Sequence, residues 1–170
     1  MSSLPKNHMT ASCSCGNVEL EATGTPILSN VCYCDDCQEG SRRIEALPNA
    51  SPVRDPDGGT AYILYRKDRV KCSRGAPLLG DYKIREGSAT NRVVATCCNS
   101  PMYLDFEKGH WLSMYRTRFR GAVPPVQMRI QTKFKSENSD VPSDVPNYAG
   151  YPLKFMAKLV VARIAMLLRR

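Results

Sequence analysis

The stretch Val31-Cys-Tyr-Cys-Asp-Asp-Cys-Gln38 places three cysteines, Cys32, Cys34 and Cys37, within six residues. Thiolates are good zinc ligands, and closely spaced cysteines on a turn converge on one ion at little entropic cost. Cys34 and Cys37 also have the spacing of a thioredoxin-type redox pair. No βαβ pattern surrounds them, however, and a third thiol lies two residues upstream. Metal binding is therefore the favoured interpretation, ahead of a redox pair and of a disulfide framework.

Four of the remaining five cysteines form two further groups. Cys13-Ser-Cys15 repeats the spacing of Cys32-Tyr-Cys34, and Cys97-Cys98 is a vicinal pair. A structural zinc site has four protein ligands, whereas a catalytic site keeps three and leaves a position for water or substrate. The seven thiols divide accordingly: Cys13, Cys15, Cys97 and Cys98 for a closed site, and the middle three for an open one.

The vicinal pair needs a special backbone. Adjacent side chains of a strand face opposite ways, so Cys97 and Cys98 reach one ion only if the chain turns there. Asn99-Ser-Pro101 supplies turn residues at that place. Coordination by one of the two cysteines, with the other packed or facing the second site, stays an alternative. Cys72 has no clustered partner and is expected to be a small buried hydrophobe.

Short runs of β-forming residues separated by turn residues predict an antiparallel, mainly β fold with a C-terminal α-helix. The expected strands are 17–22, 27–31, 60–65, 79–84, 91–96, 102–106, 111–115 and 126–133. Residues 27–31 are expected to pair back with 17–22. Two turns of helix are expected at 38–47, a linker at 136–150 and the last helix at 152–170. The predicted domains are a zinc-binding β domain at 11–120 and a basic extension at 121–170.

Charge is distributed unevenly along the chain. The net charge of +8 comes entirely from residues after His110, where 11 Lys and Arg face 3 Asp and Glu. Arg116, Arg118 and Arg120 alternate, which predicts one basic strand face, and Arg129, Lys133 and Lys135 follow. Such a patch attracts nucleic acid or an acidic membrane surface, although a solvated face explains it equally well.

Two absences in the sequence predict a cytoplasmic location. The N-terminal residues lack the apolar run of a signal peptide, and no stretch of 18 uncharged apolar residues occurs. The C-terminal helix is apolar over more than one stripe, which favours packing on its own domain or homodimerisation. Its basic ends, which include Arg169 and Arg170, also suit a membrane surface.

The cysteine pattern resembles the glutathione-dependent formaldehyde-activating enzyme family, also called the centromere protein V/GFA family. The resemblance covers roughly residues 11 to 115 and rests on Cys13-Ser-Cys15-Gly16, Cys32-Tyr-Cys34-Asp-Asp-Cys37-Gln38, Arg92 and Cys98-Asn-Ser-Pro-Met102. The family's last motif normally reads Phe-Cys-x-x-Cys-Gly-Thr. Aligned on Cys98, its first cysteine falls at Ala95, and Cys97 stands in for it. This Cys-Cys-Asn-Ser-Pro form is similar to a divergent branch of the family.

The resemblance implies an Mss4-like (β-tent) zinc-binding fold with two zinc ions. It implies a structural ion on the first and last cysteine groups and a catalytic ion on Cys32, Cys34 and Cys37. The implied activity is that of a carbon–sulfur lyase, which adds glutathione or another small thiol to a small carbonyl compound or removes it. Arg42, Arg43 and Arg92 are candidates to bind the glutathione carboxylates. The alternative is a non-catalytic, zinc-stabilised module that uses the basic C-terminal region for binding nucleic acid, membrane or protein.

Overall fold

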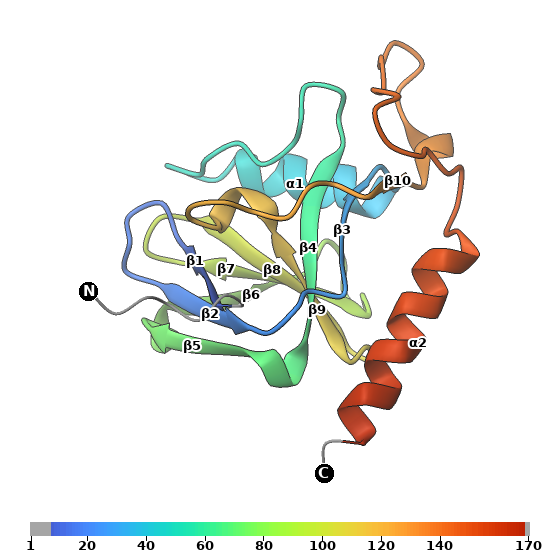
Figure 1. Ribbon diagram of the computed structural model, residues 1–170. Coiled ribbons are helices and arrows are strands. Elements are labelled where there is room, and N and C mark those ends of the chain that lie inside the picture. The colour runs from blue at the N-terminus through green and yellow to red at the C-terminus, as the bar shows by residue number, and fades with distance from the viewer. Residues whose placement is uncertain (1–7, 169–170) are drawn as a thin grey trace.

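Residues 8–168, which this computed structural model describes, form two β-sheets and two α-helices (Figure 1). The larger sheet consists of β3 (Leu28–Cys32), β4 (Thr60–Arg66), β6 (Leu79–Tyr82), β7 (Thr90–Ala95), β8 (Ser100–Phe106), β9 (Trp111–Tyr115) and β10 (Met128–Ile130). The smaller sheet consists of β1 (His8–Ser12), β2 (Glu19–Thr23) and β5 (Val70–Arg74). The helices are α1 (Asp35–Glu45) and α2 (Leu153–Leu167).

The strand orders are β10-β3-β4-β9-β8-β7-β6 and β1-β2-β5. The pairs within these sheets are antiparallel, except that β10 runs parallel to β3. This confirms the predicted mainly β, antiparallel class with a C-terminal helix. The boundaries of β9 agree with the expected strand 111–115, and β4 exceeds the expected 60–65 by one residue.

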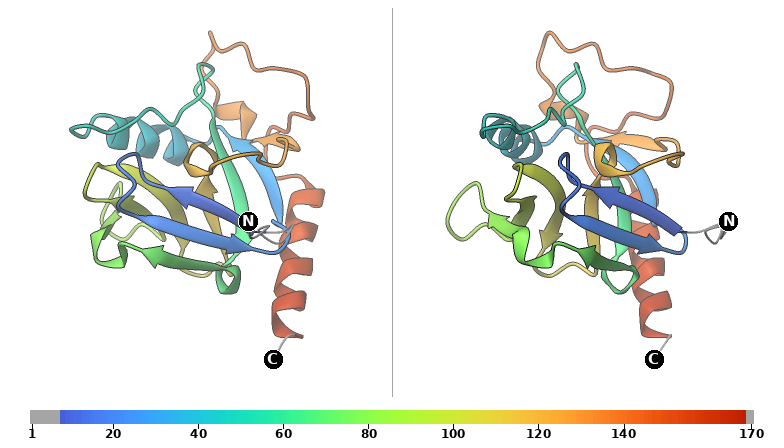
Figure 2. Two further views of the ribbon diagram at one scale, coloured as in Figure 1. Left: turned by 60° about the vertical axis from the view of Figure 1, so that its left-hand side comes forward. Right: turned by 90° about the vertical axis from the view of Figure 1, so that its left-hand side faces the viewer.

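Side chains of the large sheet enter two separate cores, one on each face. In β4, Ile63 and Tyr65 pack with the small sheet, whereas Tyr62 and Leu64 pack on the opposite face with α2. Neighbouring residues of a strand point to opposite faces, so a strand covered on both sides is apolar throughout. This explains the unbroken apolar run of β4. Figure 2 shows the small sheet and α2 on different sides of the large sheet.

The predicted secondary structure needs correction in three respects. Residues 27–31 do not pair with 17–22: β3 lies in the large sheet between β4 and β10. All five residues of β3 are buried, so the strand requires a position that is covered on both faces. Two strands, β1 and β5, were not predicted, because each is only five residues long and contains a single β-branched residue. The first helix begins at Asp35 rather than residue 38.

The predicted basic strand face is also wrong. The strand β9 ends at Tyr115, and Arg116–Arg118 form a 3-10 turn instead of continuing it. Arg118 is buried, and so is Arg129, which forms an ion pair with Asp144 at 2.6 Å. Both arginines are therefore removed from any basic surface patch.

The helix α2 packs one stripe, Phe155, Leu159 and Ala162, against the body of the protein. Its Leu159 carbonyl oxygen lies 2.8 Å from Nε2 of His110 in the β8–β9 loop. The remaining surface of the helix is largely apolar and exposed, as at Leu153, Val160 and Val161. Arg169 and Arg170, at the basic end of the helix, lie outside the described residues. Within residues 8–168, no helix has the length and apolarity needed to cross a membrane.

Candidate metal centres

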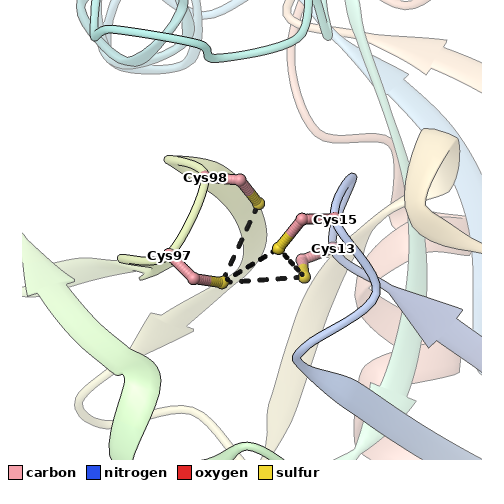
Figure 3. Close-up of side chains that lie close together, drawn as sticks. All are labelled: Cys13, Cys15, Cys97 and Cys98. Carbon is pink, nitrogen blue, oxygen red and sulfur yellow. Dashed lines mark hydrogen bonds between the residues drawn. The ribbon is translucent and has the colours of Figure 1, made fainter.

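Four cysteines from two distant parts of the sequence meet between the β1–β2 turn and the β7–β8 turn (Figure 3). The Sγ–Sγ distances are 3.6 Å for Cys13–Cys15, 3.4 Å for Cys15–Cys97, 3.9 Å for Cys13–Cys97 and 4.0 Å for Cys97–Cys98. A tetrahedral zinc site with Zn–S bonds of about 2.3 Å has sulfur–sulfur edges of about 3.8 Å. The four-cysteine cluster, Cys13, Cys15, Cys97 and Cys98, therefore fits a closed thiolate site for one metal ion.

Two tight turns bring these sulfurs together. The β1–β2 turn is closed by the amide of Cys13 bonding to the Val18 carbonyl, and the Val18 amide donates to the Cys13 sulfur at 3.2 Å. The β7–β8 turn includes Cys97 and Cys98 and ends at Asn99, whose φ of 53° lies in the left-handed region. The chain thus turns at the vicinal pair, and both sulfurs of the pair lie in the same cluster.

A buried arginine supports the four-cysteine cluster. The Arg118 Nη1 donates to the Ser14 hydroxyl at 2.8 Å and to the Ser100 hydroxyl at 3.3 Å. Ser100 in turn lies 3.1 Å from the Cys98 sulfur. Burial lowers the pKa of Arg118, whereas the nearby Cys98 and Cys13 oppose this shift. A four-thiolate zinc site carries two negative charges, which a buried guanidinium offsets in part.

The other three cysteines meet where β3 passes into α1. Cys32 is the last residue of β3, Cys34 is the N-cap of α1, and Cys37 lies in the first turn of that helix. Their sulfurs lie within 4.8 Å of one another, with 3.5 Å between Cys32 and Cys34. Tyr33 points elsewhere and bonds to Asp57. This three-cysteine cluster offers three ligands and leaves a fourth tetrahedral position open.

The environment of the three-cysteine cluster favours one thiolate. Hydrogen bonds with Cys32 and Cys37 lower the pKa of Cys34, to about 3, and the positive charge of Arg92 adds to this effect. The hydrogen bond with Cys34 is the main cause that raises the pKa of Cys32. The helix N-terminus also stabilises negative charge near Cys34. Metal binding displaces the remaining thiol protons, because the ligands bind as thiolates.

Arg92 is the buried cation of this region. Its side chain on β7 is 1% exposed, and Nη2 donates to the backbone carbonyl of Asp36. Among the described residues, its Nε and Nη1 have no hydrogen-bond partner. Arg92 lines the same cavity as the three cysteines. Arg42 and Arg43 lie elsewhere: both bind Glu39 on the outer side of α1, and neither lines the cavity.

A cavity of about 370 Å³ opens beside the three-cysteine cluster. Its walls come from the face of the large sheet and from the N-terminal half of α2. Sequence reasoning did not place α2 here, nor Arg118 beside the four-cysteine cluster, because neither has a motif or a fixed sequence spacing to the cysteines. Cys72 lies in the edge strand β5 and belongs to neither cluster.

In a comparison with known proteins, the first part of the chain matches a family model. Residues 8–52 match the model of a family described as "Glutathione-dependent formaldehyde-activating enzyme". No curated protein matches the chain at a significant level. Among solved structures, the crystal structure of a Rhodobacter sphaeroides protein, a Northeast Structural Genomics target, is similar with a TM-score of 0.48 and 18% identity. The similarity covers 68% of this chain and 92% of that protein.

Proposed function

We propose that this chain, whose residues 8–52 match the model of the glutathione-dependent formaldehyde-activating enzyme family, is a zinc-dependent enzyme of the carbon–sulfur lyase type. The observation that carries the proposal is the contrast between the two clusters. The four-cysteine cluster supplies a full set of ligands, whereas the three-cysteine cluster has one ligand fewer and opens on a cavity. An open fourth position beside a cavity is the arrangement of a catalytic site.

The proposed substrate thiol is glutathione or another small thiol, and its partner is a carbonyl compound. When bound, zinc lowers the pKa of a coordinated thiol, so that thiolate is present near neutral pH. The thiolate sulfur adds to the carbonyl carbon and forms the carbon–sulfur bond, while the carbonyl oxygen takes up a proton from solvent. The product is a hemithioacetal. The reverse reaction breaks the same bond and releases the thiol and the carbonyl compound.

The role proposed for Arg92 is electrostatic. Three cysteine thiolates and a substrate thiolate around a divalent ion leave two negative charges in a partly buried place. The guanidinium of Arg92 lies at the same cavity and has two nitrogens free of partners among the described residues. An adjacent buried cation stabilises this charge and can pair with a substrate carboxylate. Arg92 is thus proposed as the substrate-binding arginine, ahead of Arg42 and Arg43.

The non-catalytic binding module remains the second candidate, without an observation that favours it. Arg118 and Arg129 are buried, so they do not contribute to the basic surface on which this function would depend. The cytoplasmic location, the homodimer and the division at residue 120 remain predictions.

Replacing Cys37 by serine tests the proposal. We expect native mass spectrometry of the zinc-loaded wild type to show two zinc ions and, with glutathione added, a bound glutathione. Cys37→Ser should lose the glutathione adduct and one zinc ion with little change in thermal midpoint, because the four-cysteine cluster is untouched. Cys72→Ser is the matched control, since it removes a thiol outside both clusters. A glutathione adduct of equal occupancy in Cys37→Ser would contradict the proposal.

A further inference from the structure

The cavity beside the three-cysteine cluster has two chemically different parts. Its polar part holds the three cysteines, Arg92 and Asn30, whose buried Oδ1 has no partner among the described residues. The rest of the wall is mostly apolar and combines a sheet face with a helix. The sheet contributes Leu64, Leu104, Phe106 and Trp111, and α2 contributes Phe155, Met156 and Leu159.

The size and lining of the cavity are poorly matched to a one-carbon substrate. A volume of about 370 Å³ lies within the range of pockets that hold organic ligands with many heavy atoms. Water in contact with aromatic and aliphatic walls is readily displaced by an apolar group, because this removes apolar surface from water. With the glutathione sulfur at the cysteines and its carboxylate at Arg92, in the polar part, the apolar wall is left for the group attached to the carbonyl carbon.

The packing of α2 against the large sheet makes the helix a wall of the cavity. Phe155 and Leu159 are 6% and 5% exposed and pack in the same core as Tyr62, Leu64 and Leu104. The hydrogen bond from His110 to the Leu159 carbonyl also holds the helix against the large sheet. Met156 lines the cavity and is still 46% exposed, which places it at the rim. Methionine adapts well to flexible apolar ligands.

Resting on the function proposed above, we propose that the carbonyl substrate is an apolar aldehyde, medium-chain alkyl or aryl. Its reactive carbon lies at the three-cysteine cluster, and its apolar body lies between α2 and the large sheet. The helix α2 is therefore a wall of the substrate site, and the apolar wall favours this aldehyde over formaldehyde.

Binding of the apolar body is measured directly through Trp111, the only tryptophan of the chain and a residue of the cavity wall. The probe is 1-octanol, which has the apolar body and no reactive carbonyl, with methanol as the polar control. We expect a saturable change in Trp111 fluorescence with octanol and none with methanol over the same concentrations. Because no thiol chemistry is involved, the result is independent of turnover. Absence of a saturable octanol signal would overturn the inference.

Two matched variants of α2 locate the binding site. Met156→Glu puts a charge at the cavity rim, whereas Val160→Glu puts the same charge one turn further on, at a residue that is 55% exposed and does not line the cavity. Both side chains are already solvent-accessible, so neither change should prevent folding. We expect the octanol dissociation constant to rise at least tenfold in Met156→Glu and less than twofold in Val160→Glu. Equal effects of the two variants would place octanol elsewhere and overturn the inference.

Measurements of turnover distinguish a failure of this inference from a failure of the proposed function. With glutathione, we expect kcat/KM for octanal to exceed that for formaldehyde at least tenfold in the zinc-loaded protein. A preference for formaldehyde, with activity lost in Cys37→Ser, would overturn the apolar substrate and leave the proposed function intact. Octanol binding that Met156→Glu weakens, without any thiol chemistry, would overturn the function and restrict the inference to an apolar binding site.

Discussion

Cys13→Ser is expected to unfold the protein or to lower its thermal midpoint by more than any other cysteine substitution. Cys13 is 3% exposed, accepts a hydrogen bond from the Val18 amide and belongs to the four-cysteine cluster with Cys97, 84 residues away. Structural zinc contributes about 10–16 kcal/mol to the folding of small zinc domains. The total stability of a domain is about 5–15 kcal/mol, so the loss of one ligand removes a large part of it.

The measurement is thermal unfolding by circular dichroism, together with the zinc content of each variant. Cys37→Ser and Cys72→Ser are the controls, because they remove a ligand of the open cluster and a cysteine outside both clusters. We expect Cys13→Ser to bind at most one zinc ion and to resemble the wild type treated with a strong chelator. Equal losses of thermal midpoint in Cys13→Ser and Cys37→Ser would show that the division into a structural and a catalytic site is wrong.

The grouping of Cys32, Cys34 and Cys37 could be predicted because it depends on local chain geometry. Three thiols within six residues must lie close together, and the turn at Asn99 follows from a residue type that tolerates a left-handed backbone. The strands of the large sheet were also predictable, since β4 and β9 consist of β-forming residues between turn signals. These parts of the structure need little information about distant contacts.

The surroundings of the clusters could not be predicted, because they depend on packing between distant segments. The alternating arginines after Tyr115 have the pattern of a solvated strand, yet Arg118 turns inward to Ser14 and Ser100. The composition of α2 favours packing on its own domain or in a homodimer, and it also suits a membrane surface. Only the position of Phe155 and Leu159 against the large sheet shows that the helix forms one side of the cavity beside the three-cysteine cluster.

Gly40→Ala is expected to destabilise the protein by about 1–3 kcal/mol, although alanine is the better helix former. Gly40 lies inside α1 and is buried. A Cβ atom there would lie 2.1 Å from Nε and 2.5 Å from Cζ of Arg92. In an open helix the same change would stabilise by about 1 kcal/mol. Arg92 is itself 1% exposed and donates to the Asp36 carbonyl, so we expect its guanidinium to lose this hydrogen bond when it makes room for the added methyl group.

A double-mutant cycle with Arg92→Ala isolates this contact. In the Arg92→Ala background the clash is absent, so Gly40→Ala should become neutral or stabilise by up to about 1 kcal/mol. The free energy of unfolding is measured by urea denaturation for the four proteins of the cycle. An equal destabilisation by Gly40→Ala in both backgrounds would mean that the helix, and not Arg92, requires glycine at this position.

The same cycle connects the packing of α1 to the chemistry of the three-cysteine cluster. The charge of Arg92 favours the Cys34 thiolate. The guanidinium of Arg92 occupies the space that a side chain at position 40 would fill, so its position depends on Gly40. Gly40→Ala should therefore weaken glutathione binding to the zinc-loaded protein in the wild-type background. In the Arg92→Ala background, where binding is already weak, it should have no further effect. Glutathione affinity that is insensitive to both substitutions would exclude Arg92 from the thiol site while leaving its contact with Gly40 intact.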